Sequence, residues 1–196
     1  MQHNEWIFLS PILNSADITL LINKLNAVLK VLDQETFQLI KQMEWVAVPA
    51  ESGDHLSMTD REHLLKVALN SENYQIMAIA LENIKDFPVA FQFSVSTESI
   101  EEFNRKCGHF SFALFAGAPD WFILCTKLDY IVISGKLDFV EAFLGSKLDE
   151  GFSRFDEFVD NCTYESENWR KRLSRVLGQL KYEYLTAEPG ALIDLF

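Results

Sequence analysis

Residues 110–135 read FSFALFAGAPDWFILCTKLDYIVISG, and nearly every position outside the turns is apolar. This pattern predicts three short strands, joined by turns at 117–120 and 127–129 where Gly, Pro, Asp and Lys gather. The middle segment, 121–126, is apolar on both faces, which is typical of an interior strand that is covered on both sides. Upstream, residues 89–95 alternate between large apolar and small or polar side chains, which predicts another strand with one solvent-facing side.

Helical periodicity appears on both sides of this predicted sheet. Apolar residues at spacings of three and four predict helices over 17–32, 34–44, 60–70, 137–148, 152–160 and 166–185. Thr59 and Glu62 have the spacing of a capping box for the helix over 60–70. Ser96 or Thr97 caps a further helix that carries Ile100, Phe103 and Cys107 and ends near Gly108.

Two segments carry mixed signals. Residues 72–86 fit either a helix or a strand, and we favour a helix because Ala, Met, Leu and Glu are strong helix formers. Residues 46–58 contain Pro49 and Gly53 and are predicted to be a linker.

Together these elements predict an α+β fold. Its mostly antiparallel sheet would have about four strands (89–134), covered by helices, beside a helical N-terminal portion. A chain of 196 residues is expected to form one domain, 1–196. A helical subdomain over 1–45 and an α+β body over 59–188 are the alternative division.

The charge balance narrows the classes of partner. The chain has 17 basic and 29 acidic residues, a formal net charge of −12. Binding to nucleic acid or to anionic lipid needs a basic surface, so neither is expected, whereas a basic protein partner is compatible with this charge. The longest uncharged run of the apolar region, 110–119, is too short to span a bilayer.

The cysteine pattern and the first residues predict a cytoplasmic protein. Three cysteines, with no CxxC pair, do not form a disulfide framework, so a reducing compartment is expected. No Lys or Arg precedes Lys24, so the start lacks the basic region of a signal peptide.

The sequence offers no recognisable catalytic or cofactor-binding motif. It contains no GxxxxGK[ST], GxGxxG or GxSxG pattern. Cys107 and His109 lie two residues apart without a third ligand nearby, so no metal site is predicted. Cys107 lies near a predicted helix C-terminus, whose dipole disfavours the thiolate that a nucleophile needs. We therefore predict no catalytic residues, no cofactor and no metal.

Charge segregation near the C-terminus is the most unusual feature of the sequence. Residues 138–167 hold nine acids against Lys147 and Arg154, whereas 168–181 hold five basic residues and no acid. Either the two runs pair with each other or they form separate surfaces that bind partners. The predicted partner-binding residues are Asp149, Glu150, Asp156, Glu157, Asp160 and Tyr164. A basic patch that would hold a phosphate or an acidic peptide is formed by Arg170, Lys171, Arg172 and Arg175.

These observations favour a non-enzymatic, soluble, acidic protein that acts by protein–protein binding, in the manner of an inhibitor, an immunity protein or an adaptor. The alternative is a small-molecule-binding domain, or an enzyme of unrecognised type, with an apolar aromatic pocket at Trp121, Phe122 and Tyr130. A third hypothesis is a structural subunit of a larger assembly. The sequence leaves the partner and the oligomeric state open.

Overall fold

The computed structural model describes residues 6–31, 36–40, 42, 44–53, 55–69, 75–162, 165–185 and 192–194. Within them the helices are α1 (Ser15–Leu25), α2 (Met58–Leu69), α3 (Thr97–Cys107), α4 (Leu137–Leu144), α5 (Leu148–Asn161) and α6 (Glu167–Leu185). The strands are β1 (Ser10–Ile12), β2 (Leu29–Val31), β3 (Thr36–Leu39), β4 (Trp45–Glu51), β5 (Gln75–Ala80), β6 (Ala90–Ser94), β7 (Phe112–Ala116), β8 (Trp121–Cys125), β9 (Tyr130–Lys136) and β10 (Leu192–Asp194).

The main sheet has seven strands in the order β1-β6-β5-β7-β8-β9-β4, and its neighbouring strands pair antiparallel. A second sheet has the order β10-β3-β2. The α+β class is confirmed, but the prediction of a four-stranded sheet over 89–134 is wrong. The sheet is larger because β1, β4 and β5, which all precede residue 89 in sequence, join the strands that the pattern predicted.

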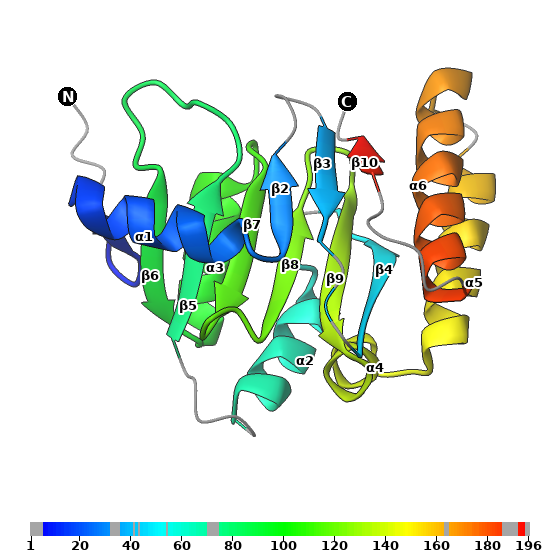
Figure 1. Ribbon diagram of the computed structural model, residues 1–196, viewed down its shortest axis with the longest axis horizontal. Helices are drawn as coiled ribbons and strands as arrows, with labels where there is room; N and C mark the ends of the chain where they lie inside the picture. Colours follow the sequence, from blue (N-terminus) through cyan, green and yellow to red (C-terminus); the bar gives the residue numbers. More distant parts are fainter. Residues whose placement is uncertain are drawn as a thin grey trace.

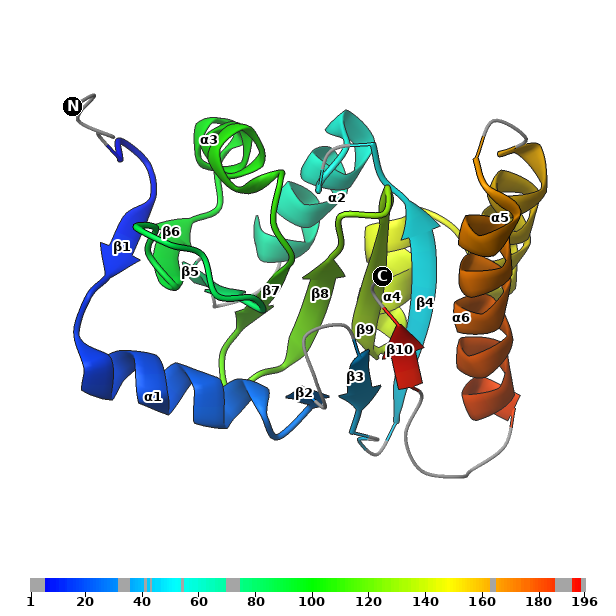
Figure 2. The same ribbon diagram turned by 90° about the horizontal axis from the view of Figure 1, so that it is seen from above.

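The helices form layers on the main sheet (Figures 1 and 2). Viewed from above, α2 and α3 lie over one face, while α1 and the second sheet lie over the other (Figure 2). Helix α4 lies at the lower end of β9 and β4 (Figure 1). Helices α5 and α6 stand side by side next to β4, at one edge of the sheet (Figure 1). This arrangement leaves the central strands without a solvent-facing side.

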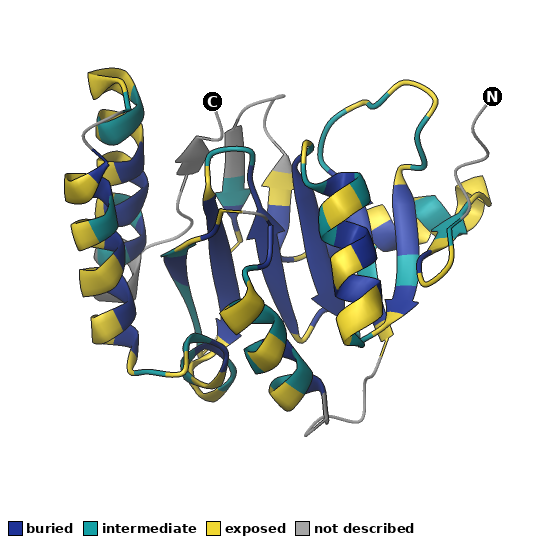
Figure 3. Cartoon of the chain, turned by 180° about the vertical axis from the view of Figure 1, so that it is seen from behind, coloured by how far each residue is buried: buried dark blue, intermediate teal, exposed yellow. Residues whose placement is uncertain are grey.

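The core lies at β7, β8 and β9, the three strands that the apolar run 110–135 predicted. Every residue of β7 and β8 is buried, which confirms an interior strand at 121–125. The sheet is buried throughout its centre, and the helices turn their buried sides towards it (Figure 3). Phe103 of α3, for example, packs edge-to-face on Phe112 of β7, with ring centroids 5.4 Å apart.

The predicted helical N-terminal portion is wrong. Helix α1 ends at Leu25 rather than at residue 32, and β2 follows at Leu29. Residues 36–39, predicted to be helical, form β3, which pairs antiparallel with both β2 and β10. A strand needs partners that are distant in sequence, and local apolar spacing does not reveal them.

Two further predictions fail for related reasons. Residues 75–80 form β5, an inner strand between β6 and β7, although their composition favours a helix. Residues 45–51, predicted in part to be a linker, form β4. Pro49 is tolerated there because β4 pairs only with β9, and an edge strand can present a proline on its unpaired side.

The two edges of the main sheet are protected differently. Strand β1 is three residues long and has Pro11 at its centre, which removes a backbone donor from an edge. Strand β4 is covered by α5 and α6 (Figure 1). The proline in the short strand β1 and the helices over β4 both discourage pairing with a strand of another chain.

Helix starts follow local capping chemistry. Ser96 caps α3, and the Ser99 amide donates to Ser96 Oγ at 3.1 Å while the Ser96 amide donates to Ser99 Oγ at 3.0 Å. For α2 the capping box is at Ser57 and Asp60 rather than at Thr59 and Glu62. The helix begins two residues earlier than its apolar spacing indicated, so its cap shifts by the same number of residues.

Candidate functional site

The predicted acidic surface is divided between two sides of α5. The residues of α5 that line hollows in the surface are Asp149, Glu150, Gly151, Ser153, Arg154, Phe155, Glu157, Phe158 and Asn161. Asp156, in contrast, lies 3.7 Å from the Lys181 ammonium of α6. Asp160 is exposed, and Tyr164 lies outside the described residues.

Three adjoining hollows meet at Arg154, which lines all of them. Their volumes are about 210, 370 and 400 Å³. We call the three hollows together the α5 groove. Its charged residues are Glu51 at the end of β4, Asp60 of α2, and Asp149, Glu150, Arg154 and Glu157 of α5.

The carboxylates of the groove outnumber its single guanidinium by five to one. Arg154 donates a hydrogen bond from Nη2 to Ser146 Oγ, in the turn before α5. Within the described part of the chain, Glu51, Asp60, Glu150 and Glu157 form no ion pair. Other carboxylates do so: Glu82 lies 3.1 Å from Lys127, and Glu141 lies 2.7 Å from Lys147. The groove therefore carries an excess of negative charge, which Arg154 offsets only in part.

The innermost hollow, of about 210 Å³, is the most enclosed by secondary structure, and we call it the Asp60 cavity. It combines residues of four elements. Strand β4 contributes Ala50 and Glu51, and α4 contributes Leu144. Helix α5 contributes Gly151, Arg154 and Phe155. The start of α2 contributes Thr59, Asp60 and His63, and the residue before this helix is Ser57.

Asp60 is the most constrained acid of this cavity. Its Oδ2 accepts a hydrogen bond from the Ser57 amide at 2.9 Å, and its Oδ1 has no partner among the described residues. Burial raises the pKa of Asp60, and the hydrogen bonds from Ser57 and the nearby His63 oppose that rise without cancelling it. The carboxylate is thus only partly compensated for its removal from water.

His63 is held in one orientation. Its Nδ1 lies 2.6 Å from the Phe143 carbonyl oxygen, which can only accept, so Nδ1 carries the proton. Gly145, at φ +63°, makes room for the ring: a Cβ there would lie 2.5 Å from His63 Cε1. In the neutral ring Nε2 is then an acceptor, and it has no partner among the described residues.

The predicted basic patch on α6 is also only partly available. Lys171 lies 2.6 Å from Glu167 on the same helix, and Lys181 pairs with Asp156 across the α5–α6 contact. Arg170 is half-buried, and its Nε is buried without a hydrogen-bond partner in the described part of the chain. Arg172 and Arg175 are exposed. Pairing between the acidic and basic runs therefore accounts for some of these charges and leaves an excess of acidic residues in the α5 groove.

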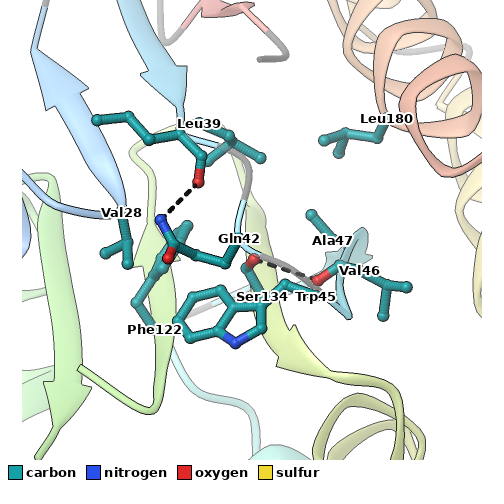
Figure 4. A pocket seen from close by; sticks show the side chains of 10 residues that line it. Val28, Leu39, Gln42, Trp45, Val46, Ala47, Phe122, Ser134 and Leu180 are labelled. Atoms are coloured by element: carbon teal, nitrogen blue, oxygen red, sulfur yellow. Dashed lines mark hydrogen bonds between the residues drawn. The ribbon is translucent and has the colours of Figure 1, made fainter. Parts of the chain in front are cut away.

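The aromatic residues of the alternative hypothesis lie in the core. Trp121 stacks on Phe139 with ring centroids 5.0 Å apart, and Tyr130 packs against Phe155. Phe122 lines an apolar crevice between the two sheets, together with Val28, Leu39 and Trp45 (Figure 4). The crevice has a volume of only about 50 Å³. Sites for small organic ligands are larger, roughly 300–1,000 Å³.

The thiols are buried and unsuited to nucleophilic chemistry. Burial raises the pKa of Cys107 to about 12, and burial also raises that of Cys125. His109, two residues from Cys107, is exposed, while Cys107 has no exposed surface.

Sequence reasoning missed Glu51 and Asp60 as members of the groove. Glu51 lies in the segment that the sequence predicts to be a linker, and the sequence places Asp60 only at the start of a helix. The Ser57–Asp60 spacing is visible in the sequence as a capping box, but its proximity to α5 follows from the chain path and from no local signal.

No protein-family model, no curated protein and no solved structure matches this chain. Among the described residues, none of the helices is long and apolar enough to cross a membrane.

Proposed function

We propose that this protein is a non-enzymatic binding protein that holds a basic partner protein in the α5 groove. Inhibitors, immunity proteins and adaptors work in this way, through a surface rather than a reaction. One observation carries the proposal: five carboxylates from three separate elements gather around hollows whose lining holds a single basic residue, Arg154.

Charge complementarity explains why such a surface would select a partner. An acidic groove on a protein of net charge −12 accelerates the encounter with a basic protein and opposes acidic ones. Binding should weaken as salt is added, because most of these carboxylates lie near the surface and are screened.

The small-molecule alternative has weaker support. Of its three aromatic residues, Phe122 alone lines the apolar crevice, and the crevice is small. A reducing, cytoplasmic location stays a prediction from the cysteine pattern.

The test starts from affinity capture on the immobilised chain, elution with salt and identification of the retained protein by mass spectrometry. The purified partner is then measured by surface plasmon resonance against the double variant Glu51→Lys/Glu157→Lys. We expect at least about a hundredfold weaker binding, mostly through a slower association rate at low salt.

The matched control is Asp160→Lys, a charge reversal of an exposed residue on the same helix that lines none of the three hollows. We expect its affinity to stay within about threefold of the wild type, since a charge outside the contact contributes little. Equal losses in the control and the groove variant, or no loss in either, would show that the groove is not the binding surface.

A further inference from the structure

The Asp60 cavity has the composition of a receptor for one long basic side chain. Its walls are partly apolar, from Ala50, Leu144 and Phe155, and its polar groups are mainly acceptors. A lysine side chain is amphipathic in the same way, with an alkyl stem that packs on apolar surface and an ammonium that needs acceptors.

We propose that the Asp60 cavity binds a single lysine side chain of the partner, which anchors the partner in the α5 groove. This inference rests on the proposed function and names the chemical group that the groove recognises. The ammonium would donate to the Asp60 and Glu51 carboxylates.

The hydrogen-bonding inventory supports this assignment. An ammonium has three donors and no acceptor. The Asp60 and Glu51 carboxylates supply acceptors for these donors: Asp60 lines the cavity, and Glu51 lines both this cavity and the next hollow. Arg154, the one guanidinium on the wall, donates one of its five N–H groups to Ser146 Oγ, outside the set of residues that line the cavity.

The cavity is also pre-formed. His63 is fixed by the Phe143 carbonyl and by Gly145, and Gly151 allows α5 to approach α4 closely, because a Cβ there would lie 2.8 Å from Leu144 Cδ1. A rigid receptor loses little conformational entropy when the side chain enters. The volume of about 210 Å³ is small for a metabolite and suits one side chain.

The partly buried carboxylate of Asp60 explains why the cavity would bind a cation in preference to a neutral group. Its carboxylate has lost part of its hydration, and the hydrogen bonds from Ser57 do not fully replace it, so a charged donor would add stabilisation. Neutral ligands of the same shape lack that contribution.

The test uses n-butylammonium chloride as a probe for the lysine side chain and 1-butanol as its uncharged counterpart, titrated into the ¹⁵N-labelled full chain. We expect butylammonium, at millimolar concentration, to shift the amide signals of Ala50, Asp60 and Gly151, and butanol to leave them in place. Asp60→Asn keeps the shape of the side chain and removes its charge, so the butylammonium dissociation constant should rise at least about tenfold.

Asp160→Asn is the control on α5 and should bind butylammonium like the wild type. Because Asp60 also caps α2, Glu51→Gln is the second variant and should weaken binding without touching a helix cap. Equal shifts with butanol, shifts spread over the surface, or equal affinities of Asp60→Asn, Glu51→Gln and Asp160→Asn would overturn the proposal.

The two proposals fail in different ways. If Glu51→Lys/Glu157→Lys loses the purified partner and Asp60→Asn retains it at wild-type affinity, the groove is correct and the lysine anchor is wrong. If the double variant keeps the partner, the proposed function itself is wrong, whatever butylammonium does.

Discussion

The amide of Phe8 donates a hydrogen bond of 2.6 Å to Glu102 Oε2, which joins the N-terminal segment to α3 across 94 positions of sequence. The neighbouring amides of Ile7 and Leu9 donate to the same carboxylate at 3.1–3.2 Å. Lys106 completes the arrangement at 3.0 Å from Glu102 Oε1. The Glu102 side chain is only 2% exposed, so its charge depends on these donors.

Glu102→Gln should destabilise the fold by about 3 kcal/mol, because an amide has one acceptor oxygen and places an NH2 group against backbone donors. Urea unfolding at pH 7 measures the difference. Glu101→Gln is the matched control, since Glu101 is exposed and pairs with Arg61 at 3.0 Å at the surface, where such a pair contributes less than about 1 kcal/mol. Equal effects of the two variants would contradict the role given to Glu102.

The contribution of Glu102 should also depend on pH. Burial disfavours its charged form, but hydrogen bonds from Phe8, Lys106, Ile7 and Leu9 outweigh burial, so the pKa of Glu102 lies below its ordinary value. A lowered folded-state pKa gives stability that is fully present above the unfolded-state pKa, about 4.3, and is lost as pH falls through the folded-state pKa. The difference in unfolding free energy between wild type and Glu102→Gln should therefore shrink between pH 6 and pH 3. A constant difference over that range would contradict this assignment.

Gly145→Ala should cost about 2–3 kcal/mol of unfolding free energy, since residue 145 has φ +63° and the new Cβ would lie 2.5 Å from His63 Cε1. Thermal or urea denaturation measures this loss. Gly178→Ala is the control: no atom lies within 4 Å of the added Cβ, and alanine in a helix is favoured by about 0.5–1 kcal/mol. The double variant His63→Ala/Gly145→Ala should recover the part of the loss that comes from the ring.

Ser96→Ala should destabilise the protein by about 1 kcal/mol, because it removes the side chain that accepts from the Ser99 amide at the start of α3. Thr97→Ala, at the next position, should change the stability by less than half of that, since Thr97 is exposed and already helical. A larger effect at Thr97 would place the cap one residue later than the structure does.

The native thiols should resist modification. With the pKa of Cys107 at about 12, against an ordinary 9.0, its thiolate fraction at pH 8 falls roughly a thousandfold. Cys125 and Cys162 are buried. We expect negligible reaction with DTNB at pH 8 until denaturant is added, when three equivalents react. Rapid reaction of one thiol in the native protein would show that its surroundings open.

Local pattern was sufficient where the chemistry is local. The run 110–135 predicted β7, β8 and β9 correctly, and Ser96 marked the start of α3. Local pattern failed at Gln75–Ala80 and Thr36–Leu39. There the local sequence indicated a helix, but pairing between distant strands decided the outcome. The α5 groove shows the same division, because its α5 carboxylates were predicted and Glu51 and Asp60 were not.

The sequence by itself determined the buried centre of this protein, the cap of α3 and the acidic character of the chain, since each depends on neighbouring side chains or on composition. Only the tertiary structure decided how many strands the sheet has and which carboxylates share a groove. Both depend on contacts between segments far apart in the chain, such as β4 with β9 and α2 with α4, and no short window of sequence contains both partners.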